Sequence, residues 1–297
     1  MPDAFETLRE ALGQTGLYGA AEPDPAFAAR LRARVERALT LPRGVTVSDL
    51  EIDEPAGNAP LHEPAHHGDI AYVSLWVPDL EKAVGFWGGV LGWELEPASG
   101  PDGRQIRDIR PHHGIYGGQG KALLFVCYLV EDLDSAVGRV LDAGGSAEAP
   151  TAQAYGRVSM CKDNQGMALG LWEPPAGQWP DRWAINGERH GDVSYVTLHV
   201  VDSRLARSFY GAVLGWEFEP GRVADGWGPR DVSPMMGMAG GHADCTASAM
   251  YRVDDLASVV ARVRQAGGTA TDPVDQPYGS MSECHDDQGT HFWLGQH

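Results

Sequence analysis

Hydrophobic and polar residues alternate along several short runs of this chain, and each run is followed by a segment with helical spacing. AYVSLWV, from Ala71, has the alternation of a half-buried strand, and PDLEKAVGFWGGVLG after it has apolar residues every three or four positions. ALLFVCYLV and EDLDSAVGRVLDAGG repeat this order, with glycine again at the end of the helical segment. Shorter runs between turn residues (GWELEPAS, RQIRDIR, YGRVSMCKD, MALGLW) predict further strands. The pattern predicts a unit of one strand, one helix and about three more strands, present four times.

The whole pattern recurs once at a constant offset. HGDIAYVSLWV begins at His67, and HGDVSYVTLHV begins 123 residues later at His190. LGWELEP from Leu91 recurs as LGWEFEP from Leu214, and the Ala-Gly-Gly, Tyr-Gly and single-Cys matches keep the same offset without a gap. A register of this length indicates two copies of one domain.

The repeat sets the expected domain organisation. The two domains should span residues 67–174 and 190–297, and the Pro- and Gly-rich residues 175–189 should link them. Residues 1–66 precede both copies. Within them Asp24–Leu39 predicts a helix, because Asp24 can cap it, Pro25 fits its first turn and apolar residues recur every four positions.

Composition and charge narrow the class of partner. The 297 residues carry 23 Lys and Arg against 41 Asp and Glu, a formal net charge of −18, which disfavours nucleic acid and anionic membrane surfaces. No apolar run approaches the ~20 residues needed to span a bilayer, and the N-terminus lacks the features of a secretory signal. The four cysteines form no CxxC pair. We therefore expect a cytoplasmic monomer or homodimer that binds a small molecule.

The repeated motifs resemble a known superfamily. V-x-D-L-x-x-A-x-x-F-W/Y-x-x-V-L-G-W-E, V-x-D-L-x-x-A-V-x-x-V-x-x-A-G-G and Y-G-x-x-x-x-x-D-x-x-G are similar to motifs of the vicinal oxygen chelate superfamily, which includes glyoxalase I, extradiol dioxygenases and bleomycin-resistance proteins. The resemblance covers about residues 67–297. It implies an α+β fold of two tandem domains, each made of two βαβββ modules that curl into a half-open barrel, after a short helical N-terminal segment. The fold alone does not supply the function.

The resemblance also implies six positions at which metal-using relatives carry ligands. In each copy, one position lies five residues before the Val of each of the two V-x-D-L motifs, and a third lies on the last strand after D-x-x-G. In this sequence the six positions hold Tyr72, Phe125 and Gly170 in the first copy, and Tyr195, Ser248 and Trp293 in the second. These side chains do not make a site for a divalent cation, which needs His, Glu, Gln or Asp. We expect no metal and no cofactor.

Strand alternation predicts what lines the first pocket instead. If position 72 faces inward, positions two and four residues on share its face. The expected lining is aromatic and nearly uncharged: Tyr72, Trp76, Phe125 and Trp172. Such a surface suits a flat apolar ligand, and Gly170 should add room. The alternative is that these aromatic side chains fill a core.

The second pocket is predicted to be more polar. Its candidate catalytic residues are His199, Tyr195, His291 and Cys284, and its candidate substrate-binding residues are Thr197, Arg252 and Trp293. A histidine beside Tyr or Cys can act as a general base or acid near neutral pH. The alternative is that His199 and His291 are hydrogen-bonded residues without chemical work, and a metal site improvised from them with a carboxylate is a third reading.

Other residue pairs carry weaker signals. His112 and His113 are expected in a solvated loop. Arg107-Asp108, repeated as Arg230-Asp231, predicts either an anion clamp or a structural ion bridge.

Two functions fit these observations. The first is a metal-independent enzyme that acts on a hydrophobic, aromatic small molecule, as in natural-product tailoring, with proton transfer through His199 and Tyr195 as its partner. The second is a protein of the bleomycin-resistance type that binds or sequesters a small molecule or antibiotic unchanged.

Overall fold

Two sheets with the same strand order form the structure, a computed structural model that describes residues 63–98, 100–182 and 187–297. The predicted helix at Asp24–Leu39 lies outside the described residues. None of the helices in these ranges combines the length and the apolar composition that a membrane-spanning helix requires.

The first domain contains β1 (Ile70–Trp76), α3 (Leu80–Leu91), β2 (Leu95–Pro97), β3 (Gly103–Ile106), β4 (His112–Tyr116), β5 (Leu123–Leu129), α4 (Leu133–Asp142), β6 (Ser146–Ala147), β7 (Thr151–Gln153), β8 (Gly156–Lys162) and β9 (Ala168–Glu173). Its strands are ordered β2-β3-β4-β1-β5-β9-β8-β6, with β7 on β8. The second half of the domain therefore has one short strand more than the three predicted after each helix.

The second domain repeats this order with β10 (Val193–His199), α5 (Ser203–Leu214), β11 (Phe218–Pro220), β12 (Gly226–Pro229), β13 (Met236–Ala239), β14 (Thr246–Arg252), α6 (Leu256–Gln265), β15 (Thr269–Ala270), β16 (Val274–Gln276), β17 (Gly279–His285) and β18 (His291–Gln296). The predicted fold of two tandem domains, each with two strand-helix-strand modules, is confirmed.

Three V-x-D-L motifs and the equivalent V-V-D-S at residues 200–203 explain where the helices begin. Asp79, Asp132, Asp202 and Asp255 have extended backbones, and the carboxylate of each accepts a hydrogen bond from a backbone N–H in the first turn of its helix. α3 and α5 end at Gly92 and Gly215, whose φ angles of 70° and 72° lie in the left-handed region that glycine tolerates best.

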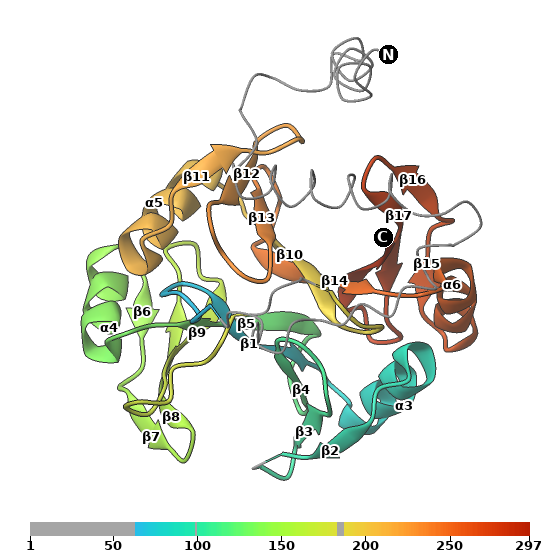
Figure 1. Ribbon diagram of the computed structural model, residues 1–297, viewed down its shortest axis with the longest axis horizontal. Coiled ribbons are helices and arrows are strands. Elements are labelled where there is room, and N and C mark those ends of the chain that lie inside the picture. The colour runs from blue at the N-terminus through green and yellow to red at the C-terminus, as the bar shows by residue number, and fades with distance from the viewer. Residues whose placement is uncertain (1–62, 99, 183–186) are drawn as a thin grey trace, which may run out of the picture. The chain divides into compact units, whose positions relative to one another are not determined.

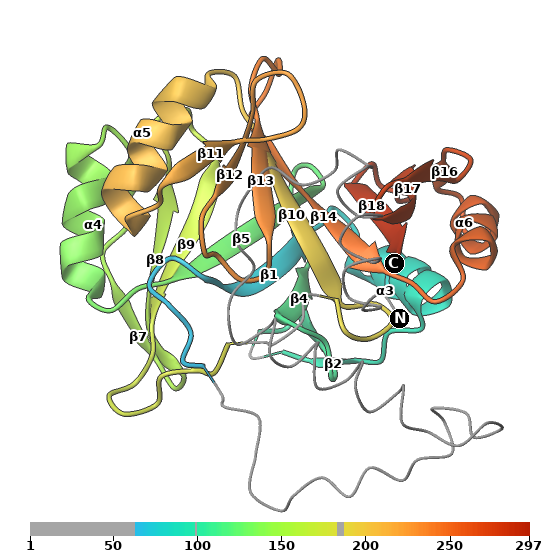
Figure 2. The ribbon, with the colours of Figure 1, turned by 45° about the horizontal axis from the view of Figure 1, so that its top comes forward.

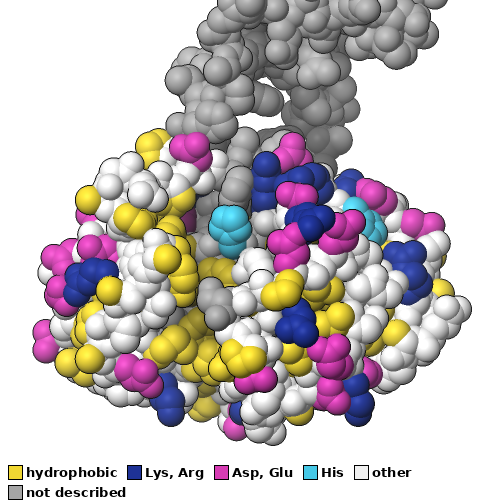
Figure 3. Space-filling view, turned by 90° about the horizontal axis from the view of Figure 1, so that it is seen from below, with side chains coloured by type: hydrophobic (Ala, Val, Ile, Leu, Met, Phe, Trp, Pro, Cys, Tyr) yellow, Lys and Arg dark blue, Asp and Glu magenta, His cyan; other side chains and the backbone are white. Residues whose placement is uncertain are grey.

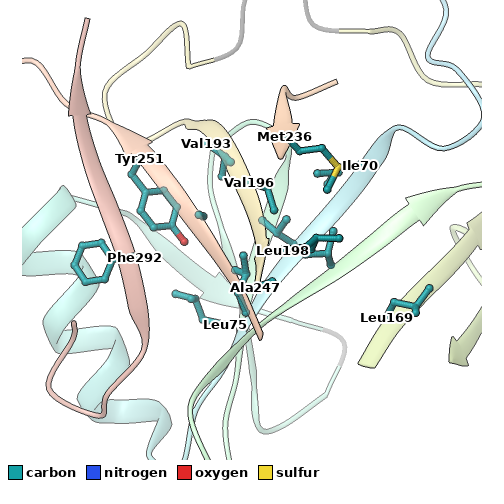
Figure 4. Packing of buried hydrophobic residues seen from close by; sticks show 14 of the residues in the cluster. Ile70, Leu75, Leu169, Val193, Val196, Leu198, Met236, Ala247, Tyr251 and Phe292 are labelled. Atoms are coloured by element: carbon teal, nitrogen blue, oxygen red, sulfur yellow. The ribbon is translucent and has the colours of Figure 1, made fainter. Parts of the chain in front are cut away.

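Each helix packs beside a helix of the other domain. α4 lies beside α5, and α3 lies beside α6 (Figure 1). The two sheets meet between these helix pairs, where β5 contacts β14 (Figure 2). Apolar side chains of both domains mix there, and Met236 lies beside Ile70 in Figure 4. The contacts join the described residues of the two domains into one compact unit. The boundaries at residues 174 and 190 stay a prediction.

The repeated HGD and LGW motifs serve this interface. Asp69 is buried and accepts a hydrogen bond from Ser233 N of the other domain at 2.8 Å, and the equivalent Asp192 accepts one from Arg110 N at 3.1 Å. A Cβ on Gly68 would lie 2.6 Å from Trp216 Nε1, so the close approach of the two domains there requires glycine. These repeated motifs are therefore explained by the contact between the domains.

Candidate functional site

Every central strand divides its side chains between the helices and the opposite, inner face of its sheet. On β10, Val196 and Leu198 are buried in the core, whereas Tyr195, Thr197 and His199 are only partly buried on the other face. The register carries the same division across the sheet, because paired residues share a face: Thr197 pairs with Ser248, and Met250 pairs with Trp293. The predicted inner faces of β10, β14 and β18 are confirmed.

The first domain is divided in the same way. Val73 and Leu75 face the core, and Tyr72, Ser74 and Trp76 face inward. Cys127 pairs with both Tyr72 and Gly170, and Phe125 lies two residues before it on β5. The three metal-ligand positions of this copy, Tyr72, Phe125 and Gly170, therefore lie on one face, as the resemblance implies.

These three positions do not fit a metal ion. A Cβ on Gly170 would lie 2.8 Å from Cys127 Sγ and 2.9 Å from Phe125 Cζ, so Phe125 and Cys127 fill the space that relatives leave to a carboxylate. The prediction that Gly170 adds room is therefore wrong. The one oxygen in the set belongs to Tyr72, and burial raises the pKa of this phenol to about 12, which disfavours the phenolate that a metal would bind.

The three metal-ligand positions of the second copy, Tyr195, Ser248 and Trp293, do not fit a metal ion either. Burial raises the pKa of Tyr195, the Ser248 hydroxyl is hydrogen-bonded to His199, and Trp293 has no lone pair to donate. Across residues 63–98, 100–182 and 187–297, no group of three or more His, Cys, Asp or Glu side chains is arranged to hold a metal ion.

The first inner face is an aromatic surface. Trp76 and Phe125 stack with ring centroids 4.7 Å apart and planes 8° apart. Trp172 is half-buried on the same face, and its Nε1 donates a hydrogen bond to the carbonyl of Tyr155 at 2.9 Å. From below, hydrophobic side chains line a hollow near the centre of the molecule (Figure 3). Burial also raises the pKa of Cys127 to about 12, so this face has no group that titrates near neutrality among its predicted lining.

The second inner face places three polar side chains in a hydrogen-bonded row. His199 Nε2 lies 3.0 Å from Ser248 Oγ, and His199 Nδ1 lies 3.3 Å from His242 Nε2. Burial, followed by the charges of His242 and His291, lowers the pKa of His199 to about 4. The ring is therefore neutral at pH 7 and carries one nitrogen that can accept a proton.

His242 was not predicted from the sequence. It lies in the loop after β13, where its backbone N–H donates to the carbonyl of Val200 at 3.1 Å, and this bond turns the loop back beside the end of β10. The equivalent residue of the first domain is Gln119, which makes the same backbone bond to Val77. The sequence signal that could have identified His242 is this difference, because the first copy has Gln119 where the second has a histidine.

His291 extends this row of side chains. Its ring centroid lies 5.5 Å from that of His199 and 5.0 Å from that of His285. Its Nε2 lies 2.9 Å from Glu283 Oε1, although the two groups are not aligned for a hydrogen bond. His199, His242, His291, His285 and Glu283 thus form a polar cluster at one end of the inner face, which we call the histidine row.

Cys284 does not belong to this face. It pairs with Phe292 across β17 and β18, it is fully buried in the core, and burial raises its thiol pKa to about 11. The prediction that Cys284 lines the pocket is wrong. His285 pairs with His291 around a five-residue turn, which puts Met281, Glu283 and His285 inward in place of Ser282 and Cys284.

The remaining predicted residues of the second pocket are dispersed. Tyr195 faces inward but is not a hydrogen-bond partner of His199, because four residues along a strand separate their Cα atoms by roughly 13 Å. Arg252 forms an ion pair with Asp254, and Thr197 lies between Tyr195 and His199 on β10. The proposed partnership of His199 and Tyr195 is replaced by that of His199 and Ser248.

The paired motifs outside the pockets have structural partners. His113 is not in a solvated loop: it lies on β4, is fully buried, and its Nε2 is 2.9 Å from the hydroxyl of Tyr251 in the other domain. Of the predicted pair, His112 alone is exposed. Arg107 pairs with Glu94 and Glu96, and Arg230 pairs with Glu217 and Glu219, so the structural ion bridge is the better interpretation.

A cavity of about 390 Å³ lies at the junction of the two domains, away from both inner faces. It is lined by Leu91, Gly92, Trp93, Glu94, Arg107, Asp108, Ile109 and His190. The guanidinium of Arg107 is bound to Glu94 and Glu96, and His190 Nδ1 accepts a hydrogen bond from Asp254 N at 3.2 Å.

Comparisons with known proteins agree with the fold. Residues 69–171 match the family model of the Glyoxalase/Bleomycin resistance protein/Dioxygenase superfamily. The chain is 26% identical over 257 residues to anthracycline biosynthesis protein DauV of Streptomyces sp. (strain C5), covering 76% of this chain and 92% of DauV. It is 24% identical over 264 residues to anthracycline biosynthesis protein DnrV of Streptomyces peucetius, with the same coverage of 76% and 92%.

A solved structure extends the likeness to both domains. The Mn(II)-bound glyoxalase from Novosphingobium aromaticivorans superposes with a TM-score of 0.61 over 78% of this chain and 83% of its own, at 15% sequence identity. At that identity the similarity concerns the fold.

Proposed function

Since the first domain belongs to the Glyoxalase/Bleomycin resistance protein/Dioxygenase superfamily and both domains have its fold, we propose that this protein is a metal-independent enzyme of natural-product tailoring. Its substrate is a planar polycyclic aromatic molecule of the anthracycline type. The reaction is a proton transfer on the inner face of the second domain.

One observation carries the proposal: a neutral imidazole, half-buried on an inner face, is hydrogen-bonded to a serine and to a second histidine. His199 accepts a proton from an acidic O–H or C–H of the substrate, directly or through the Ser248 hydroxyl. It later returns the proton, which its low pKa favours. His242 holds the ring in one orientation by its contact at Nδ1.

The substrate class follows from the inner face and from the relatives. Trp293 and Tyr195 are half-buried beside Met250 on the same face as His199, and such side chains suit a flat ring system. Two relatives named as anthracycline biosynthesis proteins cover three quarters of the chain, which supports a polycyclic aromatic substrate.

Metal independence is inferred from the side chains at the six ligand positions, which do not suit a metal ion. Phe125 and Cys127 fill the space beside Gly170, and the Ser248 hydroxyl is hydrogen-bonded to His199. Elemental analysis of purified protein should find no stoichiometric iron, zinc, nickel or manganese. Stoichiometric metal together with loss of activity on chelation would refute this part of the proposal.

Turnover tests the proposal as a whole. The native protein would be incubated with anthracyclines and their aglycones in D₂O, and the products analysed by mass spectrometry for deuterium at carbon or for a new mass. We expect His199→Ala and Ser248→Ala to lower the rate at least about a hundredfold, the usual contribution of a general base. His112→Ala, which removes an exposed histidine of the first domain, should leave the rate unchanged. Unchanged turnover in His199→Ala would remove this residue from the mechanism.

A second function is favoured by the first inner face, where Trp76 and Phe125 stack and the phenol of Tyr72 and the thiol of Cys127 stay neutral at pH 7. This face suits binding without chemistry, as in a sequestering protein. Ligand recovered unchanged after long incubation, with affinity lost in Trp76→Ala, would support that function against catalysis.

We also propose that the protein is cytoplasmic and is a monomer or a homodimer. All four cysteines are free, as expected in a reducing compartment. Size-exclusion chromatography with light scattering would decide between monomer and dimer.

A further inference from the structure

Two hairpins from opposite edges of the second sheet meet over its inner face. Arg222 lies in the turn between β11 and β12, and Tyr278 lies in the turn between β16 and β17. β11 and β12 begin the strand order of this sheet, whereas β17, on which β16 pairs, lies near its other end (Figure 1). Arg222 Cζ is nevertheless 5.2 Å from the centroid of the Tyr278 ring. The contact therefore spans the open side of the curled sheet.

The two side chains also reach the inner face itself. Burial raises the pKa of Tyr195, the phenol of Tyr278 raises it further, and the positive charge of Arg222 lowers it. Arg222, Tyr278 and Tyr195 are thus neighbours. Tyr278 is 52% exposed, so about half of its side-chain surface faces solvent.

Arg222 differs from most arginines of this protein in its partners. Arg107, Arg230 and Arg252 each form ion pairs with a carboxylate. Within the described part of the chain, no carboxylate forms an ion pair with Arg222, and its contact there is with an aromatic ring. A guanidinium held against a ring keeps its N–H donors in the plane of the fork, where they can bind a carboxylate through two hydrogen bonds.

The first domain lacks this feature. The residue 123 positions before Tyr278 is Tyr155, so the aromatic side chain is repeated, but the residue 123 positions before Arg222 is Ser99. A chain with a formal net charge of −18 repels anions in general, so an arginine that no carboxylate among the described residues pairs with gives this opening a distinct preference.

We propose that Arg222 and Tyr278 form an anion-selective clamp at the opening of the second inner face, and that the ligand of this face is a planar aromatic acid. The clamp binds the carboxylate of the ligand through the Arg222 guanidinium and one ring of the ligand against Tyr278. This inference rests on the proposed function for the ring system and adds the acidic group, which determines the orientation of the ligand toward the histidine row.

The test compares two probes that share one ring system and differ in the charge of one substituent of similar size: anthraquinone-2-carboxylate, which is anionic at pH 7, and its neutral carboxamide. Isothermal titration calorimetry on the full chain should show tighter binding of the carboxylate. Arg222→Gln should weaken the carboxylate about tenfold and the carboxamide less than about twofold, as expected for loss of one charge-assisted contact. Arg222→Lys should recover part of the difference, because the charge returns without the planar fork.

A matched variant controls for net charge. Arg204→Gln removes the same charge from an exposed position near the start of α5, and both probes should bind it as they bind the native protein. Added salt should weaken the carboxylate in the native chain and much less in Arg222→Gln.

The outcomes separate this inference from the proposed function. Equal binding of the two probes to the native chain, or equal losses of both in Arg222→Gln, would overturn the clamp and leave the aromatic ligand class standing. Failure of the native chain to bind either probe would overturn both.

Discussion

Gln288 of the second domain holds Asp79 of the first through a reciprocal pair of hydrogen bonds. Asp79 N donates to Gln288 Oε1 at 2.7 Å, and Gln288 Nε2 donates to the Asp79 carbonyl at 2.9 Å. Gln165 makes the same two bonds to Asp202, at 2.8 Å and 3.0 Å. The D-x-Q-G turn of each domain therefore fixes the residue that caps the first helix of the other.

Loss of this glutamine should loosen the contact between the domains. We expect Gln288→Ala and Gln165→Ala each to lower the free energy of unfolding by about 1–3 kcal/mol, the effect of two lost hydrogen bonds. Urea denaturation would measure it. Gln153→Ala, at an exposed position on β7, is the control and should change stability by less than about 0.5 kcal/mol. A loss no larger than that of the control would show that the reciprocal bonds do not stabilise the fold.

The His113–Tyr251 contact predicts how stability depends on pH. Burial lowers the pKa of His113 to about 3, well below its ordinary value of 6.5. The unfolded chain takes up a proton below pH 6.5 and the folded chain does not, so the contribution of His113 to stability is complete above pH 6.5 and falls as the pH drops toward 3. The loss should be about 1.4 kcal/mol at pH 5.5.

Substitution of His113 by the residue of the other copy isolates that effect. The equivalent of His113 is Met236, so His113→Met introduces the apolar side chain that the second copy has at this place. It should reduce the pH dependence between 7 and 5, and at pH 7 it should cost about 1–3 kcal/mol because the buried Tyr251 hydroxyl loses its partner. His113→Met with Tyr251→Phe should recover most of that cost. An unchanged pH profile would contradict the assignment.

Gly170 predicts a local packing effect. Gly170→Ala puts a methyl group 2.8 Å from Cys127 Sγ and 2.9 Å from Phe125 Cζ, and should destabilise the protein by about 1–3 kcal/mol. Phe125→Leu in the same chain should restore part of the loss. Gly138→Ala in α4, where a Cβ meets nothing within 4 Å, should instead stabilise by about 0.5–1 kcal/mol. If Gly170→Ala were as stable as the native chain, the slot would have room for a larger side chain, and the argument against a metal would weaken.

The histidine row predicts a measurable titration. NMR of the ring C–H signals should give His199 a pKa near 4, because burial and the charges of His242 and His291 all disfavour its protonated form. His242→Asn removes one of these charges and should raise the pKa of His199, which nevertheless stays below 6.5 because burial is the largest cause. A pKa of 6 or above in the native chain would place His199 in solvent and remove the support for its role.

The repeat, the order of the helices and main strands, and the inner faces of the central strands could all be predicted from the amino-acid sequence. These features depend on local periodicity: the V-x-D-L aspartates cap the helices, and alternation along β1, β5, β10 and β14 assigns each side chain to a face. For that reason the sequence predicted correctly that four side chains lie on the inner faces: Tyr72, Trp76, His199 and Trp293.

Which of these residues act together depends on how the chain packs in three dimensions. The length of the turn between β17 and β18, five residues, determines which side chains of β17 face inward. For this reason Cys284 lies in the core, and Glu283 lies beside His291. His242 joins His199 through a loop, and Tyr251 joins His113 across the contact between the domains, at separations of 43 and 138 residues. Such pairings depend on loop geometry and on the packing of one domain against the other, and no local period in the chain records either.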